Sequence, residues 1–494
     1  MDEIYPFVIC VTIFHCCAYF FDTFFKSCMH LPYLRLLNNT GLQVKPFRLH
    51  WYTTVFNRLI QKWGSTRPKL LLAWFSAGTW IAIVLMPIAV ILLTRSIYIL
   101  LKDLVQEEKS EFTSIATLQP LVPGLNIPIS DLGYYLVTLL VCTVVHEMGH
   151  AIAAIREDGR VGGVGVVVFL CIPVAYVSLE NLELLTPLRQ LRVLCAGVWH
   201  NAVLALAAMC TLLVTPWLLL PLYDWGNGVQ IHSIQLDSPV YGMGGLMEKD
   251  LVTKVNECVV TDSYSWQNCL GRAVRLATPG YCLQSEFIKE HDESVPAKHL
   301  SLGVVECCNS NAPRHLCFEY LEIGDEPLQL PQFSCLNART VVEHSAAVCY
   351  DSHDCPVTLH CFRPSLENST KLVTIRTKTD RTVLFLGHPA EVFHTVSVSD
   401  YTNLYALFPS TIPERIRTFC QYITSFSIGM ALLNIIPCFY FDGQHIVRSL
   451  LDIYLIRHIE HASVRHAMSL CFTFIGTFIL SLYLILALWS SSIK

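Results

Sequence analysis

Six stretches of the chain are continuously apolar, without the alternation of polar residues that marks a surface helix or a half-buried strand. A helix of roughly 20 such residues crosses the hydrocarbon core of a bilayer. The stretches are 4–25, 70–101, 132–155, 190–222, 419–440 and 469–489. This pattern predicts a polytopic α-helical membrane protein with about six spanning segments.

The second stretch is longer than one crossing requires, and Pro87 lies in its middle. Proline lacks a backbone N–H and kinks a helix, while a long span can also be accommodated by tilting. The stretch is therefore either one long kinked helix or a tight pair of shorter segments. The sequence leaves both open.

A shorter apolar segment, 162–177, has a different character. It starts with glycines, is rich in β-branched residues and contains Pro173. Such a segment is too short and too β-prone for an ordinary spanning helix. We expect either a re-entrant β-hairpin, whose backbone must then be satisfied by protein or by a water-filled cavity, or a cytosolic hairpin without an active role.

Residues 223–417 are polar and form a separate region. Alternation over 228–234, a turn at Ser238-Pro239 and a strand-like run over 251–256 resemble the opening of a PDZ-like fold. Such folds bind extended peptides at an open sheet edge. A β-rich run over 372–399 is expected to return to the same sheet. We therefore predict an α+β domain in which the cysteine-rich stretch 258–361 is an insertion.

Composition supports the membrane assignment. The chain is 53% hydrophobic and 15% charged, whereas soluble domains are nearer a quarter charged. The net charge of −5 argues against a nucleic-acid partner. We divide the chain into an N-terminal membrane segment and loop, a membrane core, the polar domain and a C-terminal membrane core. The corresponding ranges are 1–69, 70–222, 223–417 and 418–494.

Ten of the 21 cysteines fall within the polar domain. An even, dense cluster in a polar region is typical of disulfides formed in an oxidising lumen. The cluster consists of Cys258, Cys269, Cys282, Cys307, Cys308, Cys317, Cys335, Cys349, Cys355 and Cys361. The sequence does not fix their pairing.

Two sequons bear on orientation. Asn368 heads Asn-Ser-Thr in a turn-rich part of the polar domain and is a candidate glycosylation site. A second sequon begins at Asn38, inside the strongly basic loop 26–69. The basic residues place that loop in the cytosol, whereas the sequon is usable only in the lumen. The two signals conflict, so the side on which the N-terminus lies stays open.

The third apolar stretch carries His146-Glu147-Met148-Gly149-His150. An ionisable residue at membrane depth indicates function. On a helix, the two histidines lie one turn apart on the same face and can bind one Zn²⁺, while Glu147 can act as the base for a bound water. We predict zinc as the cofactor, with His146 and His150 as ligands and Glu147 as the catalytic base.

A third ligand is expected from the stretch 419–440 and its continuation. The run up to Phe441 contains no lysine or arginine after residue 417, and it then delivers a single carboxylate, Asp442. A catalytic zinc site uses three protein ligands and leaves the fourth position to water. Asp442 suits that role, although alone it would be an ordinary helix cap.

Two asparagines are candidates for contacts with substrate or with a developing oxyanion. Asn201 follows Gly197 by four positions, so a small residue and an amide share one helix face. The competing interpretation is a structural amide between helices. Asn434 precedes Pro437 in a segment where the helix must break and free backbone carbonyls.

These motifs together resemble the site-2 protease family of intramembrane zinc metalloproteases, and most closely its animal members. The resemblance is carried by 146–150, by Gly197 with Asn201, and by Asn434, Pro437 and Asp442-Gly443. It covers most of the chain from about residue 70. A serine-rich run before the His-Glu helix, typical of animal members, is absent here.

The resemblance implies a function. The family cuts a transmembrane helix of its substrate after a luminal protease has shortened the ectodomain. The implied partners are membrane-tethered transcription factors of sterol regulation and the unfolded-protein response, together with surrounding lipid. The implied location is the Golgi and endoplasmic reticulum membrane, with the cysteine-rich domain in the lumen.

Two other classes of protein deserve comparison. An inactive membrane receptor or chaperone acting through its PDZ-like domain would not need Glu147, and it would be free to lose any metal ligand. Metal transporters usually contain repeated halves, and histidine-box oxidases need many more clustered histidines. Neither pattern is present, so the protease interpretation is preferred.

Overall fold

The structure is a computed structural model of the whole chain. It describes residues 4–105 and 131–493, apart from 243, 300–303, 310–313, 322–329, 357, 368, 406–407 and 410. The chain divides into two compact units. One comprises 1–214 with 417–494, and the other comprises 215–416.

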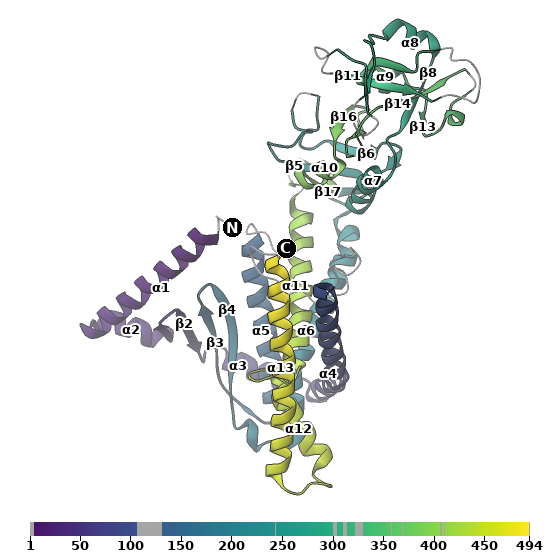
Figure 1. Cartoon of the computed structure of the whole chain (residues 1–494). Helices are drawn as coiled ribbons and strands as arrows, with labels where there is room; N and C mark the ends of the chain where they lie inside the picture. The colour runs from purple at the N-terminus through teal and green to yellow at the C-terminus, as the bar shows by residue number, and fades with distance from the viewer. Residues whose placement is uncertain are drawn as a thin grey trace. The chain divides into compact units, whose positions relative to one another are not determined.

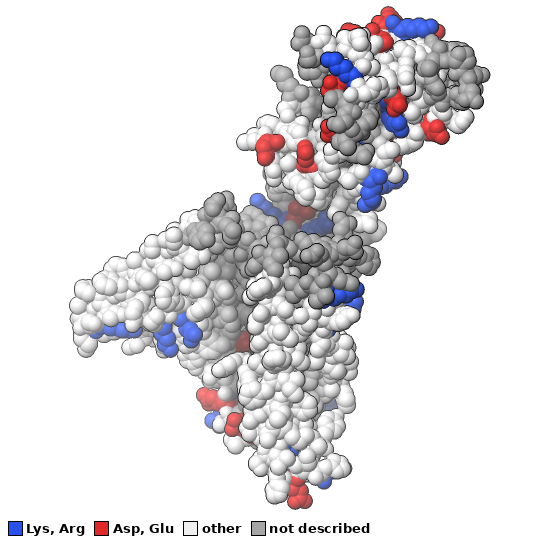
Figure 2. Space-filling view, in the orientation of Figure 1, with Lys and Arg blue, Asp and Glu red and all other residues white. Residues whose placement is uncertain are grey.

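The first unit is built around long apolar helices (Figure 1). Five described helices are long and apolar enough to cross a membrane: α1 (Ile4–Ser27), α4 (Pro68–Val105), α5 (Leu132–Arg156), α6 (Pro187–Leu219) and α13 (Ala462–Ile493). Figure 2 shows a largely uncharged surface over α1 and α13. The stretch 419–440 falls mostly in α11 (Thr411–Ile435), which is not among the five, and α12 (Asp442–Leu455) follows it. The helices thus form a polytopic membrane core.

The second apolar stretch forms one continuous helix, α4, with Pro87 inside it. This settles the choice that the sequence leaves open. Small and aliphatic residues of α4 pack against α6, α11, α12 and α13 in a buried cluster. Its members include Ala82, Ala89, Leu93, Leu191, Leu194, Ala431, Ile435, Ile446 and Leu480. These contacts connect the helices that carry the candidate site.

A four-stranded antiparallel sheet lies beside the helices. Its order is β1 (Leu42–Lys45), β2 (Arg48–Thr53), β3 (Arg160–Phe169) and β4 (Ile172–Glu180). Segment 162–177 thus forms a strand pair, and β4 packs along α5. The strands β1 and β2 come from the basic N-terminal loop, between α2 (Leu31–Thr40) and α3 (Asn57–Ser65). The hairpin is therefore supported on one side by the N-terminal region.

A buried histidine of α1 fixes the tip of this hairpin. The His15 ring nitrogen Nε2 lies 2.6 Å from the carbonyl oxygen of Leu170, in the turn between β3 and β4. The Leu170 amide in turn donates to the carbonyl of Phe47, between β1 and β2. In an apolar helix, a buried imidazole needs such a partner. His15 is therefore a packing residue that holds the turn.

The second unit contains a six-stranded antiparallel sheet made from two distant segments. The first supplies β5 (Tyr223–Ile234), β6 (Leu251–Val255) and β7 (Cys258–Val259), and the second supplies β15 (Lys371–Thr377), β16 (Thr382–Gly387) and β17 (Val396–Asn403). The order is β16-β15-β6-β5-β17, with β7 on β6. The β-rich run 372–399 thus returns to the sheet begun by 228–234. Helices α7 (Ser263–Arg275) and α10 (Pro389–Thr395) complete the layer.

Between these two segments the chain forms a second sheet. It has five strands in the order β12 (Phe333–Asn337), β11 (His315–Tyr320), β14 (His360–Pro364), β8 (Gly280–Leu283) and β13 (Val348–Cys349). Helices α8 (Ser285–His291) and α9 (Ala338–His344) and the short pair β9 (Lys298–His299) and β10 (Val305–Glu306) belong to the same insertion. Its buried core includes Tyr281, Phe318 and Phe362.

All ten cysteines of this unit form disulfides. The pairs are Cys258–Cys269, Cys282–Cys355, Cys307–Cys317, Cys308–Cys335 and Cys349–Cys361. The first joins β7 to α7 in the six-stranded layer, and the other four lie in the insertion. The predicted glycosylation residue Asn368 lies outside the described residues.

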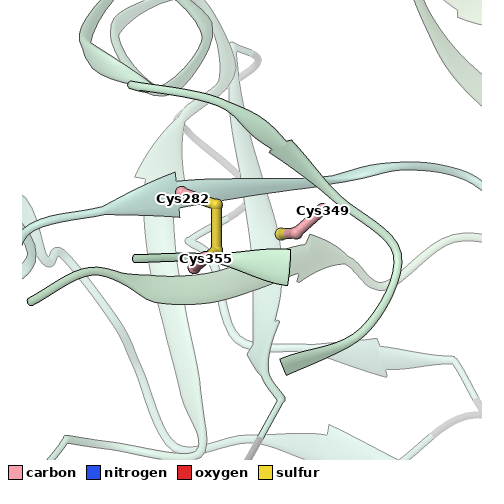
Figure 3. A group of neighbouring side chains, drawn as sticks. All are labelled: Cys282, Cys349 and Cys355. Carbon is pink, nitrogen blue, oxygen red and sulfur yellow. A yellow bond between two sulfur atoms is a disulfide. The ribbon is translucent and has the colours of Figure 1, made fainter. Parts of the chain in front are cut away.

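One group of cysteine sulfurs looks at first like a metal site. The sulfurs of Cys282, Cys349 and Cys355 lie within 4.8 Å of one another. Figure 3 shows the bond between Cys282 and Cys355, with Cys349 beside it. Cys349 is bonded to Cys361. Metal binding requires thiolates, and none is left in this group, so it is a pair of neighbouring disulfides.

Candidate active site

Helix α5 presents two histidines on one buried face. His146 and His150 are only 4% and 6% exposed. Their Nε2 atoms lie 3.2 Å apart, because residues four positions apart in a helix stack one turn above the other. Both rings therefore direct the same type of nitrogen towards a common point.

A carboxylate from the far end of the chain reaches that point. The chain leaves α11, breaks around Pro437 and begins α12 at Asp442. Asp442 Oδ2 lies 3.0 Å from His146 Nε2 and 3.1 Å from His150 Nε2. The turn is tight, since a β-carbon on Gly443 would come within 2.1 Å of the carbonyl oxygen of Ile436. Glycine at this position therefore permits the approach of Asp442.

The three donor atoms fit a zinc ion. Ligand atoms that bind tetrahedral Zn²⁺ at 2.0–2.1 Å are about 3.3 Å from one another, close to the separations of 3.0–3.2 Å found here. Two imidazoles and one carboxylate are also a donor set that catalytic zinc sites use. Residues His146, His150 and Asp442 can therefore hold the metal, as the sequence predicts.

Helix α6 closes the site from a third side. A β-carbon on Gly197 would lie 2.4 Å from His150 Nε2 and 2.6 Å from His146 Nε2. Any larger residue would fill the space that a metal ion needs. The carbonyl oxygen of Val193, one turn earlier on α6, lies 2.8 Å from His150 Nδ1. The absence of a side chain at Gly197 thus leaves room for the metal, and Val193 orients the ring of His150.

The two candidate asparagines lie in different environments. Asn201 is fully buried on α6, and its Nδ2 is 3.2 Å from His146 Nδ1. Asn434 is half-buried near the end of α11. Within the described parts of the chain, the Asn434 side chain makes no hydrogen bond. The structure thus brings Asn201 to His146, whereas among the described residues no hydrogen bond joins Asn434 to the ligands.

The predicted base, Glu147, touches the hairpin. The amide of Val177 in β4 donates to Glu147 Oε2 at 3.0 Å, and the amide of Ala175 donates to Thr143 Oγ1 at 3.2 Å. Among the described strands β4 pairs only with β3, so these amides belong to its other edge, which faces α5. The hairpin therefore orients the carboxylate that lies next to the metal ligands in the sequence.

Sequence reasoning missed the roles of Val193 and Val177. Both act through backbone atoms, so their side chains give no indication. Val193, Gly197 and Asn201 follow one another at intervals of four, and this spacing places them on one face of α6. That spacing is the one signal that could have identified the face that touches the histidines.

Comparison with known proteins decides the family. The model of peptidase family M50 matches residues 134–479, well over half of the chain. The chain belongs to peptidase family M50, the site-2 protease family. The match includes all three candidate metal ligands and Glu147. As a member of M50, the protein is a metallopeptidase.

A curated relative of this M50 peptidase supports the assignment. The chain is 24% identical over 446 residues to a membrane-bound transcription factor site-2 protease homolog of Arabidopsis thaliana. That similarity covers 80% of this chain and 84% of the relative. The likeness therefore extends over about four fifths of each protein.

Proposed function

We propose that this protein is an intramembrane zinc endopeptidase that hydrolyses a peptide bond within a transmembrane segment of its substrate. The observation that carries the proposal is the convergence of His146, His150 and Asp442 in a helix core of membrane-spanning length. Glu147 lies on the same helix, held by the amide of Val177. An inactive receptor would have no need to keep this arrangement intact.

Each residue of the site has its own role in the proposed hydrolysis. His146, His150 and Asp442 would hold a zinc ion, and the ion would supply Lewis acidity that activates water and stabilises negative charge on the peptide oxygen. Glu147 accepts the proton of the attacking water and delivers it to the leaving amine. Asn434, with an unpaired amide near the break before Asp442, is proposed to contact the substrate carbonyl.

The free edge of β4 suggests how substrate is held. An intact helix satisfies its own backbone groups, so a substrate helix must unwind locally before it is cut. An extended segment can then add to this edge of β4 by backbone hydrogen bonds, displacing the contacts that the Ala175 and Val177 amides make with α5. Because the Val177 amide is within 3.0 Å of Glu147 Oε2, such a segment would lie beside the base.

The second unit is proposed to be luminal and to select substrates. Its five disulfides suit an oxidising compartment. Its six-stranded sheet ends in the edge strands β16 and β17, and if the domain works as a PDZ-like fold, such an edge would bind extended peptides by strand addition. We propose that it admits substrates whose ectodomain has already been shortened.

The name of the relative supports a proposal for the substrates. The Arabidopsis protein is named for membrane-bound transcription factors. We propose the same class here: membrane-tethered transcription factors of sterol regulation and the unfolded-protein response, cut first by a luminal protease. Cleavage in the Golgi or endoplasmic reticulum membrane would release their cytosolic fragment.

Metal removal tests this function. The full chain, purified into lipid nanodiscs, is incubated with a single-span substrate that lacks its ectodomain, and release of the cytosolic fragment is measured. We expect a zinc chelator to abolish release and added Zn²⁺ to restore it. Release that continues unchanged in metal-free protein would contradict the proposal.

A further inference from the structure

The amide of Asn201, as placed, does not match the hydrogen-bonding needs of His146 once a metal is bound. As placed, Nδ2 faces His146 Nδ1 at 3.2 Å, and Oδ1 is buried without a hydrogen-bond partner. A buried amide oxygen without a partner is costly. The fully buried Asn201 side chain therefore needs an explanation in terms of the site it adjoins.

The three ligand atoms determine whether His146 Nδ1 carries a proton. His146 Nε2 points at Asp442 Oδ2 and His150 Nε2, so Nε2 is the nitrogen that binds the metal and must carry a lone pair. A neutral imidazole then carries its proton on Nδ1. Nδ1–H is a donor, and it requires an acceptor. The NH₂ group of Asn201 is also a donor, so the two groups as placed do not match.

Turning the amide about its last torsion removes the conflict. The oxygen and nitrogen of an amide side chain occupy nearly the same volume and are assigned from their hydrogen-bond partners. After the turn, Asn201 Oδ1 accepts from His146 Nδ1–H, and Nδ2 takes the buried place that Oδ1 left. The same logic already holds at the other ligand, where His150 Nδ1–H donates to the carbonyl of Val193.

We propose that Asn201 is a positioning residue whose amide oxygen accepts the Nδ1–H of His146 and so fixes the tautomer and ring orientation of this metal ligand. Val193 does the same for His150. One face of α6 therefore supplies an acceptor for each histidine, with Gly197 leaving room for the metal between them. This role differs from an oxyanion contact, which would use the N–H groups of the amide instead.

Two substitutions separate the acceptor role from the donor role. Asn201→Leu keeps the approximate size and removes both. Asn201→Asp keeps an acceptor and removes both N–H groups. Zinc affinity of the purified full chain is measured by competition with a chromophoric chelator. Thr211→Val, which alters an exposed hydroxyl on the same helix, is the control.

We expect Asn201→Leu to bind zinc about 10–100-fold more weakly, the usual cost of losing a hydrogen bond to a ligating histidine. Asn201→Asp should stay within about threefold of wild type, and at saturating zinc its cleavage rate should stay within about tenfold. The control should match wild type. If Asn201→Asp does not fold, Asn201→Leu still overturns the proposal should it bind zinc as tightly as wild type.

Three results would overturn the proposal. Asn201→Leu could bind zinc as tightly as wild type, or folded Asn201→Asp could lose as much affinity as Asn201→Leu. A third is normal zinc binding in Asn201→Asp with a loss of rate of about 10²–10³-fold, the cost of removing an oxyanion donor. The inference rests on the proposed metal site, but it fails separately. Wild-type protein that binds no zinc would remove the proposed function itself.

Discussion

Asp442 Oδ2 lies 3.0 Å from His146 Nε2, although the two residues are 296 positions apart in the sequence. The contact exists because α5 and the start of α12 meet in the first unit. A metal ion bound there therefore depends on the tertiary fold as well as on the local histidine motif. Each part of that arrangement can be tested separately.

Removal of the carboxylate should remove the metal. We expect Asp442→Ala to weaken zinc binding by more than about 100-fold, the upper end of what losing a supporting hydrogen bond costs. Equilibrium dialysis with metal analysis measures this. Asp452→Ala, which removes a carboxylate of the same helix that pairs with Arg465, is the control and should retain zinc. Full zinc content in Asp442→Ala would refute its role as a ligand.

Position 197, next to the two histidines, should tolerate no side chain. In Gly197→Ala the new β-carbon would lie 2.4 Å from His150 Nε2, so the helices must separate or the metal must leave. We expect zinc binding and cleavage to be lost. The matched variant is Gly429→Ala in α11, whose β-carbon would meet nothing within 4 Å. It should behave as wild type. Equal zinc affinity in the two variants would show that the metal does not need the space left by Gly197.

The amide of Val177 should matter for cleavage but not for metal binding. Val177→Pro removes this donor on the free edge of β4, where proline is tolerated. Loss of a hydrogen bond to a charged group costs about 1.5–3 kcal/mol, so cleavage should fall at least about tenfold with zinc content unchanged. Val177→Ala keeps the amide and should remain near wild type. Similar rates for the two variants would exclude a role for this amide.

The disulfides should stabilise the second unit unequally. Cys282–Cys355 spans 73 residues, whereas Cys349–Cys361 spans 12. Because cross-linking restricts the unfolded chain more when the loop is longer, removing the first pair should cost about 1.6 kcal/mol more. Thermal unfolding of the full chain with each pair replaced by alanine measures the difference. A larger loss from the shorter loop would contradict this order.

Local signals in the sequence predict much of the site. Two histidines one helical turn apart are enough to predict a shared metal, and Asp442 is the single carboxylate at the end of an uncharged run. The contributions of Val193 and Val177 could not be predicted, because they come from backbone atoms. The orientation of the Asn201 amide depends on a neighbour from another helix.

In the fold, too, local sequence patterns predict some elements, whereas tertiary contacts decide others. Continuous apolar runs predict the five described helices that could span a membrane, whereas the sixth run, 419–440, falls mostly in α11, which is not among them. Alternation predicts the strands on both sides of the cysteine-rich insertion. In contrast, β1 and β2 lie in a basic loop without a clear alternating pattern, and they are strands because they pair with each other and β2 with β3. Pro87 alone cannot distinguish a kink from a break, since packing of α4 against the neighbouring helices decides.

The most direct test of the account is a comparison of wild type with Glu147→Gln, using nanodisc protein loaded with zinc and a single-span substrate. Glutamine keeps the shape of the side chain but cannot accept the proton. The account predicts equal zinc content and a cleavage rate reduced by about 10²–10⁴-fold, the usual contribution of a general base. A zinc-loaded Glu147→Gln protein that cleaves at the wild-type rate would contradict the central claim that Glu147 is the catalytic base.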